Sequence, residues 1–229
     1  MTASLRVAVI DSGVNVPHPH LERVAGGLAL DIHGREHEDY VDRLGHGTAV
    51  AAAIHEKAPH ADIFVIKVFD AQLATSVPAL VRAIDRAGES GTRIINLSLG
   101  TPNELRRTQL EAAVARTVEH GAVLVSAREH EGVRWLPGSL DGVVGVLLDA
   151  AQPRESVAVR RLDSRVRAVV ASPFPRPIPG VPMERNLNGI SFAVANVSGV
   201  LARLLAVEPD VTTAAAAVDL LERRGDLRT

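Results

Sequence analysis

Short apolar runs alternate with longer segments of helical spacing along most of the chain. Five runs rich in Val, Ile and Leu have the length of strands: residues 5–10, 62–69, 92–99, 122–127 and 143–148. Near-continuous apolar runs of this kind are typical of strands that are buried on both faces. Helix-like segments lie between and after them: residues 46–56, 76–88, 103–120, 191–206 and 210–224. The alternation predicts an α/β fold in which a mostly parallel sheet carries helices on both faces.

Two stretches break this pattern. Residues 15–45 are rich in His, Gly, Asp and Glu, and we interpret them as a loop or a small excursion. Residues 172–190 contain five prolines, which a central strand cannot hold, so they are expected to form a surface loop. No internal repeat or linker divides the 229 residues, and we expect one domain over residues 1–229.

Composition narrows the class of protein. Hydrophobic residues make up 46% and charged residues 23%, as in soluble globular proteins, and a net charge of −2 gives no general attraction to nucleic acid or anionic membrane. The absence of cysteine excludes disulfides and thiolate chemistry. No signal-peptide pattern precedes the first strand, and Asn196, Ser198 and Arg203 interrupt the apolar run after Ser191. We therefore expect a cytoplasmic protein with no membrane or nucleic-acid partner.

Three polar residues occupy positions where α/β proteins place chemistry. Asp11 directly follows the first strand, while His46 and Ser191 each open a helix beside a glycine. Taken singly, each is more often a turn former or a helix cap. Together they follow the order Asp, His, Ser, in which one class of serine hydrolase presents its orienting acid, general base and nucleophile.

The segments around these residues resemble the motifs of the subtilisin-like serine protease family. VAVIDSGVNVPHPHL, GHGTAVAAAI and NGISFAVANVSG are similar to its Asp, His and Ser motifs, and KAPHADIFVIKV, IINLSLG and LPG follow in the same order. The resemblance spans residues 5–206. It implies a three-layer subtilisin-like fold and a peptidase that acts on a peptide or protein substrate. It also implies that Ser191 is the nucleophile, His46 the general base and Asp11 the acid that orients the imidazole.

The resemblance further implies a set of substrate-binding residues: Ser98, Leu99, Gly100, Trp135, Pro137 and Gly138. The segment 98–100 would pair with an extended substrate through main-chain hydrogen bonds. Trp135 lies near the position where relatives carry small residues at the base of the pocket for the residue before the scissile bond. Because Trp is among the largest side chains, we predict a shallow or blocked pocket, unless Trp135 packs elsewhere.

Two departures fall on the expected oxyanion hole. His130 takes the position of the Asn that donates to the oxyanion in the family, and Ile190 replaces the usual Thr before the nucleophile. One hypothesis is that a His130 N–H replaces the Asn donor. The alternative is a peptide-binding pseudoprotease with an impaired hole. The intact Asp, His and Ser favour the first, and an acyl transferase or macrocyclase on the same nucleophile stays open.

We expect no metal and no cofactor. Extracellular relatives carry a calcium-binding loop that interrupts the helix after the histidine, whereas residues 51–57 run on without an insertion. Residues 55–60, HEKAPH, imitate a zinc helix, but the spacing is one residue too long and Pro59 would break the helical face. The four histidines of the excursion are interpreted as a solvated loop: His18, His20, His33 and His37.

Two further expectations concern the substrate. Arginines at positions 154, 160, 161, 165 and 167 alternate with Val, which favours strands with one solvated face over a docking surface for an acidic substrate segment. The first strand begins by residue 5, which leaves no room for a pro-region. We therefore expect narrow-specificity processing, such as leader removal, as in the short cytoplasmic maturation protease of quinohemoprotein amine dehydrogenase.

Overall fold

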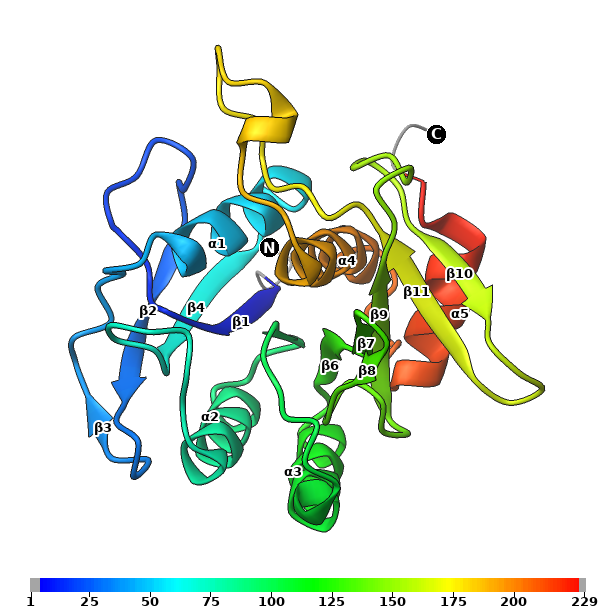
Figure 1. Ribbon diagram of the computed structural model, residues 1–229, viewed down its shortest axis with the longest axis horizontal. Helices are drawn as coiled ribbons and strands as arrows, with labels where there is room; N and C mark the ends of the chain where they lie inside the picture. Colours follow the sequence, from blue (N-terminus) through cyan, green and yellow to red (C-terminus); the bar gives the residue numbers. More distant parts are fainter. Residues whose placement is uncertain (1–4, 227–229) are drawn as a thin grey trace.

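A nine-stranded sheet forms the centre of the protein in the computed structural model, which describes residues 5–226 (Figure 1). Its strand order is β10-β11-β9-β6-β5-β1-β4-β2-β3. The strands are β1 (Arg6–Asp11), β2 (Val24–Leu30), β3 (Glu36–His37), β4 (Asp62–Lys67), β5 (Ile94–Leu97), β6 (Val123–Ala127), β9 (Val143–Leu148), β10 (Ala158–Arg161) and β11 (Arg167–Ala171). Only the outer pairs β2–β3 and β10–β11 are antiparallel, which confirms the predicted mostly parallel sheet.

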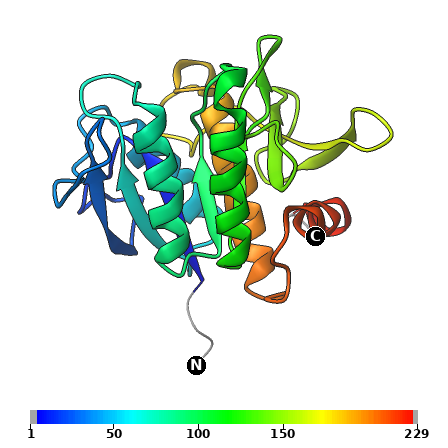
Figure 2. The same ribbon diagram turned by 90° about the horizontal axis from the view of Figure 1, so that it is seen from below.

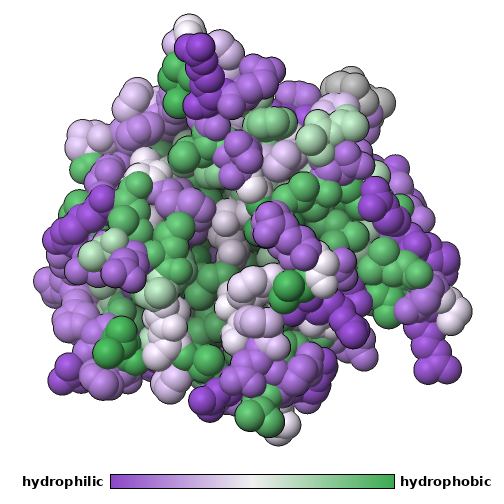
Figure 3. All heavy atoms as spheres, viewed as in Figure 1, coloured by the Kyte–Doolittle hydropathy of each residue, from purple (hydrophilic) through white to green (hydrophobic). Residues whose placement is uncertain are grey.

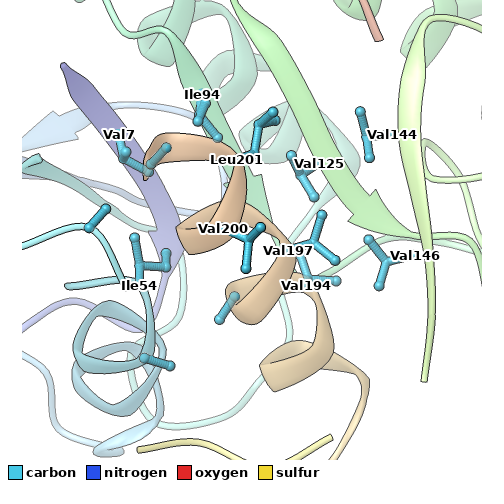
Figure 4. Close-up of a cluster of buried hydrophobic side chains, with 14 of the residues drawn as sticks. Val7, Ile54, Ile94, Val125, Val144, Val146, Val194, Val197, Val200 and Leu201 are labelled. Atoms are coloured by element: carbon cyan, nitrogen blue, oxygen red, sulfur yellow. The ribbon is translucent and has the colours of Figure 1, made fainter. Parts of the chain in front are cut away.

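Helices cover both faces of the sheet. They are α1 (His46–Lys57), α2 (Val77–Glu89), α3 (Arg107–Glu119), α4 (Ile190–Leu205) and α5 (Ala214–Arg224), with short 3₁₀ turns η1 (Glu104–Arg106) and η2 (Met183–Arg185). Val7 and Val9 of β1 pack with α1, α4 and α5, whereas Ala8 and Ile10 pack with α2 and α3. Alternate residues of a strand point to opposite faces, so one apolar run serves both cores. Figure 2 shows α2 and α3 side by side, and Figure 4 shows α4 in the other core.

The prediction for residues 15–45 was wrong in part. This stretch contains β2, a seven-residue strand that pairs in parallel with β4, and the two-residue β3. Its sequence, VAGGLAL, has two glycines at its centre and a break in register between Val24 and Gly26. Its pairing with β4 supplies the hydrogen bonds that an isolated Gly-rich segment would lack. The proline-rich stretch is a loop, as predicted, and it projects from the body above α4 and α1 (Figure 1).

Buried polar contacts fix α4 in place. Ser198 donates to Asn96 Oδ1 of β5 at 2.9 Å, and Asn196 Nδ2 donates to the carbonyls of Ser172 and Phe174 at 2.9 and 3.0 Å. Almost all of α4 is buried, which fits the predicted core helix. Over residues 5–226 no helix has both the length and the apolar character to cross a membrane. The middle of α4, one to two turns after Ser191, is therefore anchored to the sheet and to the start of the proline-rich loop.

Candidate active site

Asp11 lies at the carboxyl end of β1, in the middle of the sheet, and is only 1% exposed. Its carboxylate accepts three hydrogen bonds. His46 Nδ1 lies 2.7 Å from Oδ1, the backbone N–H of Ser12 donates to Oδ1 at 2.7 Å, and the Ser98 hydroxyl donates to Oδ2 at 3.1 Å. Ser98 directly follows β5, the parallel neighbour of β1, so both residues reach the same edge of the sheet. The carboxylate is thus held in one orientation toward the imidazole.

A second buried carboxylate, Asp42, fixes the start of α1. It accepts hydrogen bonds from the hydroxyls of Ser12 (2.8 Å) and Thr48 (2.6 Å), and from the N–H groups of Leu44, Gly45 and Thr48. Burial opposes its charge, but the bonds from Thr48, Ser12 and Leu44 outweigh burial and hold the pKa of Asp42 below its usual range. Asp42 acts as an ionised cap that holds the first turn of α1, where His46 lies.

Close backbone contact also limits where His46 can lie. Gly47, the next residue, packs so tightly that a Cβ there would lie 2.3 Å from the Gly13 carbonyl oxygen and 3.2 Å from Asp11 Oδ1. Gly45, just before His46, has φ 77°, a left-handed conformation that favours glycine. The two glycines beside His46 therefore let α1 begin within hydrogen-bonding distance of Asp11.

The His46 imidazole is largely buried, with 18% of its side chain exposed. Burial by itself favours the neutral ring, but the hydrogen bond and charge of Asp11, together with the charge of Asp42, outweigh it and raise the pKa of His46 above 6.5. The Phe192 ring packs against the imidazole, with centroids 5.5 Å apart. Because Asp11 contacts Nδ1, Nε2 is the nitrogen left to exchange a proton with another group.

Ser191 is the second residue of α4, and it lies in the same cavity as Asp11 and His46. The cavity holds about 220 Å³, and its lining is Asp11, His46, Phe69, Leu73, Ser98, Leu99, Gly100, Ala127, His130, Trp135, Ile190 and Ser191. Within the described residues no hydrogen bond joins Ser191 to His46. Figure 3 shows the face of Figure 1, hollowed near its centre with apolar residues gathered around the hollow. Three residues far apart in sequence thus meet in one small, mostly apolar cleft.

His130 lines the cleft from a hairpin that the sequence did not predict. Strand β7 (Glu129–His130) pairs with β8 (Val133–Arg134), and the turn consists of Glu131 and Gly132, both with positive φ (52° and 77°). Such two-residue turns match the twist of the strands they join. The short turn places His130 at the wall of the cleft, with 36% of its side chain exposed.

The expected substrate-binding residues divide into two groups. Ser98, Leu99, Gly100 and Trp135 line the cleft. Pro137 and Gly138 are buried behind it and are not among the lining residues. The segment that contains residues 98–100 and the segment that contains residues 135–138 meet directly, because the backbones of Thr101 and Leu136 exchange two hydrogen bonds of 2.9 Å. Trp135 is half-buried, and its indole Nε1 is buried with no hydrogen-bond partner in the described structure.

Reasoning from sequence missed Asp42 and the contact of Ser98 with Asp11. Asp42 lies four residues before His46, and a carboxylate just before a helix is a known capping signal. Ser98 had no such local signal, since it reaches Asp11 only through the pairing of β1 with β5. For metals, residues 5–226 contain no cluster of three or more His, Asp or Glu side chains arranged to hold an ion.

Comparison with known proteins agrees with this geometry. Residues 3–129 match the model of the subtilase family. The chain is 29% identical to subtilisin NAT of Bacillus subtilis subsp. natto, with 93% of this chain and 58% of that protein covered. It is 28% identical to subtilisin DY of Bacillus licheniformis, with 92% and 80% covered. It is 31% identical to a thermostable alkaline protease of Halalkalibacterium halodurans, with 90% and 58% covered. The chain therefore spans little more than half of two of these relatives.

A solved structure shows the same fold. The S41 psychrophilic protease superposes with a TM-score of 0.70 over 97% of this chain and 83% of its own, at 21% sequence identity. At that identity the likeness concerns the arrangement of helices and strands. The family match instead covers more than half of the chain and includes Asp11 and His46. The chain belongs to the subtilase family.

Proposed function

We propose that this chain is a serine endopeptidase in which Ser191 attacks the peptide carbonyl. The observation that carries the proposal is the 2.7 Å contact between Asp11 Oδ1 and His46 Nδ1 in a cleft that Ser191 also lines. His46 Nε2 takes the hydroxyl proton as the Ser191 oxygen bonds to the carbonyl carbon, and then gives it to the leaving amine. Asp11 holds the ring in one tautomer and stabilises its positive charge.

The oxyanion would form beside two groups of the cleft. The N-terminus of α4 places a positive dipole end near Ser191, and His130 faces the same cavity. A donating His130 N–H would replace the amide that relatives use. Water then hydrolyses the acyl-enzyme, with His46 acting as the base a second time. A hydrogen bond between Ser191 and His46 would form when substrate closes the cleft, as catalytic contacts often tighten on binding.

The proposed specificity is narrow. The cavity of about 220 Å³ lies below the 300–1,000 Å³ of ordinary ligand pockets, and Trp135 occupies part of its wall. Such a cleft favours a small side chain before the scissile bond. Removal of a leader from one peptide or partner protein in the cytoplasm is the role that agrees with this selectivity.

A fluorophosphonate probe tests the proposal without a known substrate. Wild-type protein should form one covalent adduct on Ser191, identified by mass spectrometry, and the Ser191→Ala variant should form none. Ser164→Ala, in the exposed β10–β11 turn, is the matched control and should label fully. Folded wild-type protein without an adduct would refute the hydrolase and favour the pseudoprotease alternative. Competition by added amines during peptide cleavage would separate transfer from hydrolysis.

A further inference from the structure

Four arginines in or next to the β7–β8 and β10–β11 hairpins carry unpaired charges. Arg128 follows β6, Arg134 ends β8, Arg161 ends β10, and Arg165 lies in the β10–β11 turn. Within residues 5–226 the side chains of these four make no ion pair and no hydrogen bond. Their sequence neighbours do: Arg160 pairs with Asp149, and Arg167 pairs with Asp219 and Glu222. Arg154 likewise pairs with Glu56. The basic segment of the sequence thus divides into paired and unpaired members.

Arg128 lies against the β7–β8 hairpin, since its carbonyl oxygen accepts a hydrogen bond from the Trp135 N–H at 2.9 Å. Burial lowers the pKa of Arg128, and the positive charge of Arg134 lowers it further, while Glu129, Asp163 and Asp141 act in the opposite direction. Arg128 therefore lies within electrostatic reach of Arg134 and of the β10–β11 turn, since Asp163 is in that turn. Figure 1 shows the two hairpins on the same side of β6. We call Arg128, Arg134, Arg161 and Arg165 the basic rim.

The nearby carboxylates do not neutralise the basic rim by contact. Asp163 accepts hydrogen bonds from the backbone N–H groups of Arg165 and Val166, at 2.7 and 2.8 Å, which close its own turn. Glu131 is turned toward His130, with 3.9 Å between Oε1 and Nε2. Glu129 and Asp141 act on Arg128, and Glu104 acts on Arg134, only at a distance. A half-buried guanidinium without a hydrogen-bonded partner is costly, so Arg128 gains most from an added carboxylate.

The position of the basic rim relates it to the cleft. Arg128 directly follows Ala127, and Arg134 directly precedes Trp135, and both Ala127 and Trp135 line the cleft. A peptide that occupies the cleft would therefore extend over these guanidiniums. Carboxylates bind guanidinium groups through two parallel hydrogen bonds, which gives both affinity and orientation. The net charge of −2 gives no general attraction to a long polyanion such as nucleic acid, so a short acidic segment that contacts only the basic rim is the occupant we favour.

We propose that the basic rim binds Asp or Glu residues of the substrate polypeptide within a few positions of the scissile bond. This inference rests on the proposed function, because it assigns the substrate class to that site. It predicts a selective peptidase for acidic segments. The pairing of carboxylates with Arg128 and Arg134 would supply the affinity that a cleft of about 220 Å³ cannot supply alone.

A binding experiment tests the basic rim apart from catalysis. In a Ser191→Ala background, a fluorescein-labelled ten-residue peptide of alternating Glu and Ala is titrated by anisotropy beside its Gln–Ala counterpart. We expect the Glu peptide to bind at least tenfold more tightly at low salt, and the preference to shrink as salt rises. Arg134→Gln with Arg165→Gln should remove the preference. Arg106→Gln with Arg203→Gln is the control, because both are exposed arginines outside the two hairpins, and this double variant should keep the preference for the Glu peptide.

Three results would overturn the inference. The first is equal affinity for the two peptides, and the second is an equal loss of the preference in the Arg106 and Arg203 control variant. The third is equally tight binding of a ten-nucleotide oligothymidylate, which would indicate general attraction to polyanions. Failure of the proposed function would look different, because it would leave wild-type Ser191 without a fluorophosphonate adduct whatever the peptides do. Circular dichroism melting of each variant confirms that the compared proteins are folded.

Discussion

The two walls of the cleft differ in how firmly they are held. On one wall, Asp11 lines the cleft, and Asp42 lies behind the lining; both are buried, and each accepts several hydrogen bonds from groups on different elements. On the other wall, His130 lies on a two-residue strand and the indole N–H of Trp135 has no partner among the described residues, while the neighbouring Arg128 and Arg134 side chains are unpaired. The first wall, which we call the rigid wall, is held in place by its hydrogen bonds. The second leaves polar groups for a substrate to satisfy.

The difference follows from the origin of each wall. Asp11 and Ser98 come from the ends of adjacent central strands, where neighbouring parallel strands fix the backbone. His130 comes from a hairpin that pairs only with itself through two residue pairs. Short hairpins tolerate changes of sequence that central strands do not. Asp11 and Ser98 are therefore held by the central sheet, whereas His130 is held by a hairpin of two-residue strands.

The largest effect on the labelling rate is expected from a substitution in the rigid wall. Asp11→Asn keeps the shape of the side chain but removes the charge and favours the wrong imidazole tautomer, so the fluorophosphonate labelling rate of Ser191 should fall by about 10⁴. Asp210→Asn, at an exposed turn, is the control. A fall of less than tenfold would show that Asp11 does not orient His46.

A smaller effect is expected from the hairpin wall. His130→Ala should lower the labelling rate by roughly 10²–10³, a range established on subtilisin, a relative of this chain, for loss of one oxyanion donor. His130→Asn should restore much of the rate, because an amide N–H can donate in the same place. Val133→Ala, on the partner strand, controls for loss of the hairpin. Full activity of His130→Ala would exclude His130 as the donor.

Loss of Asp42 should affect stability more than chemistry. Asp42→Ala leaves the N–H groups of Leu44, Gly45 and Thr48 without their acceptor, and we expect a loss of about 3 kcal/mol in the free energy of unfolding. Urea unfolding measures it. Asp39→Ala, an exposed carboxylate in the same loop, should shift the midpoint far less. Similar shifts in the two variants would contradict a capping role for Asp42.

A substitution of Trp135 tests which side chains the cleft accepts before the scissile bond. Trp135→Ala enlarges the cleft, and we expect cleavage after large apolar residues to rise about tenfold relative to cleavage after Ala or Gly. Digestion of a mixed peptide library, read by mass spectrometry, gives the ratio. An unchanged ratio, or a wild-type preference for large aromatic residues, would mean that Trp135 does not limit the pocket.

The smallest expected effect is on the pH dependence of the labelling rate. Attack by Ser191 needs a neutral His46, so the labelling rate should rise with pH to a plateau with a midpoint above 6.5, because Asp11 and Asp42 raise the pKa of His46. The same shift stabilises the fold at low pH, and that stability is lost as pH rises through the folded-state pKa. Asp11→Asn should move the midpoint down. A wild-type midpoint at or below 6.5 would refute the coupling.

Most of the fold could be predicted from the sequence because its signals are local. The apolar runs predicted β1, β4, β5, β6 and β9, and residue spacing predicted the five α-helices. Strand β2 was missed because two glycines weaken its propensity and only pairing with β4 stabilises it. The β7–β8 hairpin was missed because two-residue strands carry no hydrophobic periodicity. A contact with a distant segment thus decides β2, whereas a two-residue turn with positive φ at Glu131 and Gly132 decides the hairpin.

The sequence by itself determined that Asp11, His46 and Ser191 are the candidate catalytic residues, because each lies at a strand end or helix start that a short motif defines. It also identified the departures His130 and Ile190. Only the tertiary structure decided that Ser98 and Asp42 support the rigid wall, and which arginines are paired. The physical reason is that hydrogen bonds and ion pairs join residues such as Arg167 and Glu222, which the fold brings together from separate elements.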